Sequence, residues 1–301
     1  MQITDAHHHL WCPVNDTANI NYVWLKKIGA PKPFGDPTAI QRDYLSDEFR
    51  SESTRHNIVA SVHVQADGAI PDPVRESEWL QELGENKGLP TAHIGFLDLT
   101  SPDVENTLER YQKLTGFRGV RQILSRIDDR PDISFVPEHY LQNPQWRDQF
   151  ALLAEHGLSF DLQLYPQQMA EAAEFFSQHK DIPLVIDHAG SPYDQSAKGL
   201  QQWHTGMAEL AALPHCSVKL SGFGMFDTQW TADSIQPLFD GMLELFGAKR
   251  MMWGSNFPVD KLMRDYDFVI AQIKACAKRC GLSDHEIEQI FHHNAQTFYK
   301  L

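Results

Sequence analysis

Three consecutive histidines, His7 to His9, follow a short segment, Ile3 to Ala6, near the start of the chain. That segment predicts a buried β-strand, in which alternate side chains point to the same face. His7 and His9 would therefore project together, while His8 would point away. Two imidazoles on one face at a strand end provide half of a metal site or half of a catalytic site. A purification-tag remnant is the alternative, but a run of three between apolar residues does not resemble one.

Polar side chains also stand at the ends of several further apolar segments along the chain. They are His63, Gln65, Arg121, Asp161, Gln163, His188, Lys219, Ser221 and Asn256. Taken singly, each has an ordinary explanation: Lys219 and Asp161 could form an internal ion pair, and His63 could be a core histidine with a backbone partner. Gln65 could tie down a loop. Burying each without a partner would cost on the order of a few kcal/mol, so together they predict one functional site.

The elements that must position these side chains alternate regularly. Strands are expected at 57–65, 91–97, 117–124, 158–164, 183–188, 216–221 and 250–256, after the first strand that leads into the histidines. Helices are expected between them, near 39–54, 73–87, 101–114, 145–155, 167–179, 200–212, 234–245 and 265–278, and a capping box at Ser283 and Glu286 opens a final helix. Eight strand–helix units predict a parallel (β/α)8 TIM barrel in one domain, residues 1–301. An open doubly wound sheet is disfavoured because no glycine-rich phosphate motif follows the first strand.

A long connection, residues 12–37, separates the first strand from the rest of the barrel. Loops of this length inside a compact domain are usually functional. Trp24 in this loop, together with Trp11, is a candidate apolar wall for a substrate ring, although core packing explains each of them equally well.

The net charge of −14 argues against nucleic acid or an anionic membrane surface as a partner. It leaves an anionic small substrate open, because a local pocket can oppose the overall field. The four cysteines form no Cys-x-x-Cys pair, and the chain shows neither a signal peptide nor an apolar stretch near 20 residues. We therefore expect a cytoplasmic protein with a small-molecule substrate, and a homo-oligomer remains open.

Six short motifs together resemble a known family. They are Asp5-Ala6-His7-His8-His9-Leu10-Trp11, Val64-Gln65-Ala66, Gly116-Phe117-Arg118-Gly119-Val120-Arg121, Ile186-Asp187-His188-Ala189-Gly190, Lys219-Leu220-Ser221-Gly222 and Gly254-Ser255-Asn256-Phe257-Pro258. The whole chain resembles the amidohydrolase superfamily. Within its second family, it is similar to the sugar lactonases, such as L-fucono- and L-rhamnono-lactonase, and to 2-pyrone-4,6-dicarboxylate lactonase.

The resemblance implies a hydrolase of carbohydrate metabolism that opens a lactone of a sugar acid or a related carboxylic acid. His7, His9 and His188 would bind one divalent metal, zinc by preference, or polarise the lactone carbonyl directly without a metal. Arg121 would hold a carboxylate or hydroxyl of the substrate, and His63, Gln65, Gln163 and Trp24 would complete the binding site.

The sequence departs from the family pattern at two strand ends. Gln163 stands where many amidohydrolases have a metal-binding histidine, which argues against a bridged two-metal site. Asn256 stands where the family usually has an aspartate that acts as general base, and a neutral amide cannot take a proton from water. Asp260, Asp161 and His63 are the alternative bases.

Two other function classes therefore remain. One is a metal-dependent decarboxylase or hydratase of the same family, and the other is a catalytically altered barrel that binds a sugar acid.

Overall fold

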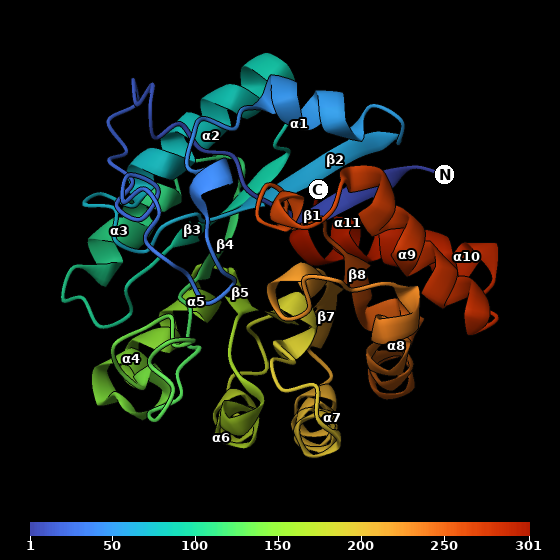
Figure 1. The fold of residues 1–301 in the computed structure, drawn as a ribbon. Helices are drawn as coiled ribbons and strands as arrows, with labels where there is room; N and C mark the ends of the chain where they lie inside the picture. Colours follow the sequence, from blue (N-terminus) through green and yellow to red (C-terminus); the bar gives the residue numbers. More distant parts are fainter.

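The computed structural model describes residues 1–301, and eight parallel strands form its centre (Figure 1). The strands are β1 (Ile3–His8), β2 (Ile58–Val64), β3 (Ala92–Phe96), β4 (Phe117–Arg121), β5 (Ser159–Leu162), β6 (Leu184–Ile186), β7 (Cys216–Leu220) and β8 (Met251–Trp253). They follow one another in sequence order across a single sheet, and every neighbouring pair from β1 to β8 is parallel. This order is the one that right-handed β–α–β crossovers produce.

The two ends of the sheet meet just beyond β1 and β8. The amide of His9 donates to the carbonyl of Phe257 at 2.7 Å, and the amide of Asn256 donates to the carbonyl of His7 at 2.7 Å. The carboxylate of Asp5 reinforces this seam, because it accepts from the Ser255 amide at 2.9 Å. The predicted (β/α)8 barrel is confirmed, and the seam places the first histidines beside Asn256.

Helices surround the strands (Figure 1). They are α1 (Ser46–Ser53), α2 (Val74–Lys87), α3 (Val104–Tyr111), α4 (Pro144–Phe150), α5 (Leu152–Glu155), α6 (Met169–Phe176), α7 (Ala197–Ala211), α8 (Ala232–Phe246), α9 (Tyr266–Arg279), α10 (Asp284–Glu288) and α11 (Asn294–Tyr299). The capping box predicted at Ser283 and Glu286 is confirmed at the start of α10. The helix predicted at 101–114 spans only Val104–Tyr111, and Asp103 is its N-cap. No helix is both long and apolar enough to cross a membrane.

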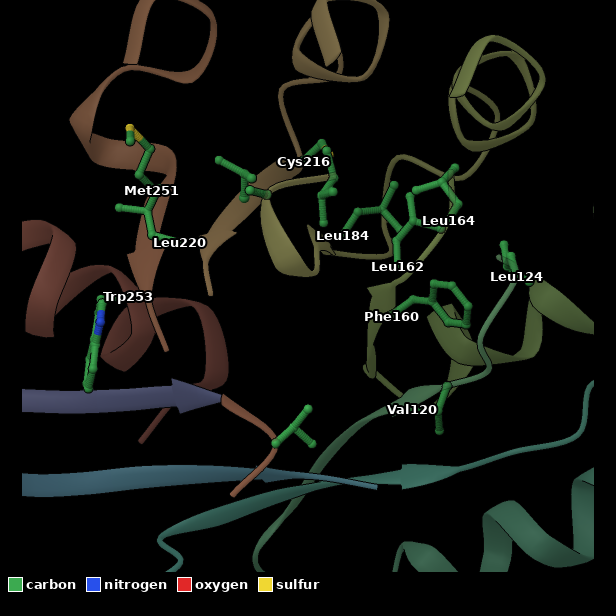
Figure 2. Packing of buried hydrophobic residues seen from close by; sticks show 14 of the residues in the cluster. Val120, Leu124, Phe160, Leu162, Leu164, Leu184, Cys216, Leu220, Met251 and Trp253 are labelled. Atoms are coloured by element: carbon green, nitrogen blue, oxygen red, sulfur yellow. The ribbon is translucent and has the colours of Figure 1, made fainter. Parts of the chain in front are cut away.

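The main hydrophobic core lies between the strands and the helices that surround them. Phe160, Leu162, Leu184 and Leu220 are each fully buried in this layer, and Figure 2 shows them among their neighbours. Alternate residues of the same strands point inward, and there polar side chains replace apolar ones toward the carboxyl ends. The core therefore fixes the barrel from outside and leaves the inner ends of the strands free for chemistry.

The loop that follows β1 is held in place by two side chains. The Asp67 carboxylate accepts from the amides of Val23 at 2.5 Å and Trp24 at 3.0 Å. The Gln41 amide donates to the carbonyls of Trp24 and Lys27, both at 2.9 Å. These bonds order the loop over the carboxyl ends of the strands.

Candidate functional site

The three histidines predicted as metal ligands lie together at the carboxyl ends of β1 and β6. The ring centroid of His7 is 5.1 Å from that of His9 and 4.5 Å from that of His188. His8 points away, as alternation requires, and its ring stacks on Phe49 at 4.4 Å. His188 has a φ of 53°, a conformation that residues other than glycine rarely adopt and that is concentrated at functional sites.

Each of these imidazoles is held through its Nδ1 atom. The partners are Asp187 Oδ1 at 3.2 Å from His7, the Val64 carbonyl at 2.6 Å from His9, and Ser221 Oγ at 3.1 Å from His188. The Val64 carbonyl can only accept, so Nδ1 of His9 carries the proton and its Nε2 keeps a lone pair. Nδ1 of His7 faces both an acceptor, Asp187 Oδ1, and a donor, Lys219 Nζ, each at 3.2 Å. Nε2 of His7 is buried and has no partner. The arrangement thus leaves Nε2 as the nitrogen available for a ligand.

All three imidazoles are neutral at neutral pH. Burial, followed by the nearby charge of Lys219, lowers the pKa of His7 well below its usual value. Burial and the Arg121 guanidinium do the same to the pKa of His9. Burial lowers the pKa of His188 to about 3, even though the Asp187 carboxylate acts in the opposite direction. A neutral imidazole is the form that binds a metal or accepts a proton.

A single divalent cation fits these donors. His7, Asp187 and His188 each offer a ligand atom within 4.8 Å of the others, and the unpartnered Nε2 of His7 needs a ligand. Zinc takes three or four nitrogen and oxygen ligands of this kind. Asp187 thus joins His7 and His188 in this group, either as a ligand itself or as the partner that orients His7, whereas the predicted ligand His9 is not part of it.

Asp187 also forms ion pairs with two buried cationic side chains, those of Lys219 and Arg121. Its carboxylate lies 3.1 Å from Lys219 Nζ and 3.4 Å from Arg121 Nη1. Burial alone would raise the pKa of Asp187, but Lys219 and His7 hold it well below its usual value. Lys219 in turn pairs with Asp161 at 2.5 Å. Asp187 is therefore an ionised counter-charge rather than a free proton acceptor.

A cavity of about 390 Å³ opens beside the histidines. Seven of the predicted site residues line it: His9, Trp24, Gln65, Arg121, Gln163, His188 and Asn256. Arg121 is positioned by the Gln65 carbonyl at 2.6 Å and by Gln163 Oε1 at 3.2 Å, and its Nε atom is buried without a partner. Gln163, the residue that replaces the usual histidine, thus holds the arginine.

His63 does not line this cavity. Its ring is fully buried, and its Nδ1 atom accepts a hydrogen bond from the Leu10 amide at 3.0 Å. Its Nε2 atom lies 3.8 Å from the buried carboxyl of Glu76. These contacts are those of a core histidine with a backbone partner, the ordinary explanation that the sequence had left open.

None of the alternative bases reaches the cavity. The Asp161 carboxylate accepts from Lys219 and from the Tyr299 hydroxyl, the latter at 3.1 Å. Asp260 lies behind Asn256 and accepts from its side-chain amide at 3.1 Å. That bond leaves Asn256 Oδ1 buried and unpartnered at the cavity wall. Burial raises the pKa of Asp260 to about 7, although the bond from Asn256 acts to lower it.

Sequence reasoning assigned no role to three residues of the site. Asp187 precedes His188 directly, and its place at a strand end was a usable signal. Lys27 and Lys32, in the loop after β1, also line the cavity. Nothing in the local sequence pattern places these two lysines there, because the course of the loop depends on contacts with Asp67 and Gln41.

The chain belongs to the amidohydrolase family. The family profile, described as amidohydrolase, matches residues 4–301. The predicted family membership is therefore confirmed over nearly the whole chain.

Named relatives cover nearly the full length. An uncharacterised protein, y4mH, of Sinorhizobium fredii is 35% identical over 299 residues, which cover 99% of this chain and 98% of that protein. An L-fucono-1,5-lactonase of Burkholderia ambifaria is 26% identical and covers 99% of this chain and 95% of its own. The crystal structure of an amidohydrolase from Burkholderia multivorans with bound zinc is 27% identical, covers 100% of both chains and has a TM-score of 0.82. These similarities agree with the predicted resemblance to sugar lactonases.

Proposed function

We propose that the protein hydrolyses a lactone of a sugar acid or of a related carboxylic acid. The observation that carries this proposal is the convergence of three neutral imidazoles, each held through Nδ1, beside a substrate-sized cavity. Water that attacks a lactone carbonyl creates negative charge on its oxygen, and a cation or fixed dipoles at that point lower the barrier. The relatives named as L-fucono-1,5-lactonases support the choice of a lactone.

His7, His9 and His188 would hold one divalent ion, zinc by preference, with Asp187 beside them. Such an ion supplies Lewis-acid polarisation of the carbonyl. The zinc-bound relative from Burkholderia multivorans supports this assignment.

The remaining residues bind and orient the substrate. Arg121 is fixed by its partners, and its free Nε–H can donate to a hydroxyl or carboxylate of the substrate. Gln65, with an unpartnered Oε1 atom, provides a neighbouring acceptor. Trp24 forms part of the apolar wall.

The cavity wall offers imidazoles, but no free carboxylate, as proton acceptors for an attacking water. Asp67 is the only acidic residue that lines the cavity, and backbone amides of Val23, Trp24 and Ala69 occupy its oxygens. Asn256 is an amide. When no metal is bound, a neutral imidazole of the cavity wall, His9 or His188, is therefore the group that can take the proton.

The direct test is a pH-indicator screen of a sugar-lactone library, with chelator and with added zinc. We expect turnover of at least one lactone and a loss of about a hundredfold or more in kcat/KM for His188→Gln. His139→Gln is the matched control, since that partly exposed histidine pairs with the exposed Asp128 and does not line the cavity. Equal activity of the two variants would refute the assignment of His188.

Asn256 favours a second candidate, because it lacks the basicity that ordinary hydrolysis uses. A purified protein that holds a divalent metal yet opens no lactone would indicate a decarboxylase or hydratase. A protein with neither property that still binds sugar acids would indicate a binding barrel.

A further inference from the structure

The cavity carries positive charge in a strongly acidic protein. Its lining includes three cations, Lys27, Lys32 and Arg121, against one carboxylate, Asp67, whereas the whole chain has a net charge of −14. Arg121 is paired with Asp187, and Asp67 is occupied by backbone amides. Neither Lys27 nor Lys32 is in an ion pair. Two ammonium groups therefore stand on the side of the cavity that the long loop forms, and the Asp67 carboxylate is the one opposite charge near Lys32.

The side chain of Lys32 is held in place by its contact with Trp24. Its Nζ atom lies 4.9 Å from the centre of the Trp24 ring, a cation–π distance. That ring is fixed in turn, because its Nε1 atom donates to the Ala66 carbonyl at 2.7 Å. Lys32 is half-buried, and burial lowers its pKa, although the Asp67 carboxylate acts in the opposite direction. An ammonium that has lost part of its hydration gains more from a counter-ion than one in open water.

The position of Lys27 is fixed through its backbone. The Gln41 amide binds its carbonyl at 2.9 Å and also binds the carbonyl of Trp24, so both residues belong to one ordered turn. The neighbouring Lys26 differs, because it pairs with Asp16 at 3.0 Å and does not line the cavity. The loop thus directs two of its lysines to the cavity and satisfies the third outside it.

We propose that the substrate lactone carries a second, anionic group, which Lys32 and Lys27 bind at the loop side of the cavity while the ester lies at the histidines. This inference rests on the proposed lactonase function and narrows it to lactones with a carboxylate or phosphate substituent. A neutral lactone lacks such a group and leaves the two ammonium ions with Asp67 as their only carboxylate in the cavity lining.

The test compares three lactones of the same ring and configuration. One carries a terminal hydroxymethyl group, the second a carboxylate in its place, and the third a phosphate ester on the hydroxymethyl group. We expect kcat/KM for a charged lactone to exceed that of the neutral one by about tenfold or more, and to fall as salt is added. The charged group that gives the larger gain identifies the natural substituent. Equal values for all three lactones would overturn the proposal.

Variants separate the two lysines from general effects of charge. Lys32→Gln should lower kcat/KM for the charged lactone about tenfold more than for the neutral one, mainly through KM, and Lys27→Gln about threefold more. Lys26→Gln is the matched control and should change neither. A loss in Lys32→Gln that is the same for both lactones would refute the role of Lys32 in binding the anion.

Binding measurements distinguish a failure of this inference from a failure of the lactonase proposal. Calorimetry with an open-chain sugar diacid and the corresponding monoacid needs no turnover. Tighter binding of the diacid, weakened in Lys32→Gln, supports the anion site even if no lactone is opened. Equal affinity for the two acids overturns it, whatever the catalytic result.

Discussion

Exchanging Asn256 and Asp260 tests how far the absence of an aspartate at position 256 lowers the catalytic rate and the metal affinity of the site. The amide of Asn256 donates to Asp260 Oδ1 at 3.1 Å, so the two side chains form a buried amide–carboxyl pair with the amide at the cavity wall. The double variant Asn256→Asp/Asp260→Asn keeps one amide and one carboxyl but places the carboxyl in the cavity. If hydrolysis lacks a carboxylate base, this variant should gain about 10² to 10⁴-fold in kcat on a lactone that the wild type opens slowly. It should also retain more zinc, measured by metal analysis after dialysis.

The single variant Asn256→Asp should behave differently, because it places two carboxyls at this separation. Two unit charges 3.1 Å apart repel by about 5 kcal/mol at an effective dielectric constant of about 20. Burial already raises the pKa of Asp260 to about 7, so one proton would stay shared between the two acids at neutral pH. We therefore expect a smaller gain than in the double variant, and one that appears only as the pH rises.

Two results would refute this reasoning. If Asn256→Asp gains as much in kcat as the double variant, the two carboxyls do not repel each other as their short separation predicts. If both variants lose activity while far-ultraviolet circular dichroism shows an intact fold, the side chain of Asn256 itself contributes to binding or catalysis. Its unpartnered Oδ1 would then be an acceptor for the substrate or for water.

Three further predictions concern residues around the site. Arg121→Ala should lower kcat/KM by about 10- to 100-fold. Arg118→Ala should not, because the guanidinium of Arg118 binds the Thr115 carbonyl outside the cavity. Equal losses in the two variants would contradict a role for Arg121 in the site. Ser221→Ala removes the Nδ1 partner of His188 and should weaken zinc affinity by about 10- to 100-fold in a chelator competition; unchanged affinity would exclude His188 as an oriented ligand. Burial raises the pKa of Glu76 from 4.5 to about 8, so the contribution of its protonated form to stability is complete below pH 4.5 and is lost as the pH rises toward 8. In urea unfolding between these pH values, the free energy of unfolding of the wild type should therefore fall by on the order of a few kcal/mol relative to that of Glu76→Gln. Parallel pH profiles of the two proteins would contradict this prediction.

The barrel could be predicted from sequence because its signals are local and repeated. Each strand is a short apolar run, and each helix is amphipathic or capped, as Ser283 and Glu286 show at the start of α10. The ends of elements were less certain. The segment near residue 39 becomes an α-helix only at Ser46, because Thr38–Ile40 form a short 3-10 helix and Tyr44 pairs with Trp11 in an isolated β-bridge. Contacts of that kind are invisible to a local pattern.

The partners of the site residues could not be predicted in the same way. Strand ends indicated that His9, Arg121 and His188 would gather, but not that Gln163 would hold the guanidinium. Nor did the pattern indicate that Lys27 and Lys32 would reach the cavity, since both lie in a loop without a regular period. These contacts depend on the final separation of side chains from distant parts of the chain, which only the folded structure fixes.

His9 and His63 show most sharply where sequence reasoning stops. Each was predicted as a histidine at the end of a buried strand, and each forms a hydrogen bond with the backbone of the residue next to the other. His9 Nδ1 faces the Val64 carbonyl, which can only accept, so its proton is on Nδ1 and Nε2 keeps a lone pair toward the cavity. His63 Nδ1 faces the Leu10 amide, which can only donate, so in the neutral ring the proton is on Nε2. A histidine in that tautomer has no lone pair left for a metal. The identity of one backbone partner thus decides which of two equivalent histidines can act, and no property of either residue in the sequence reveals it.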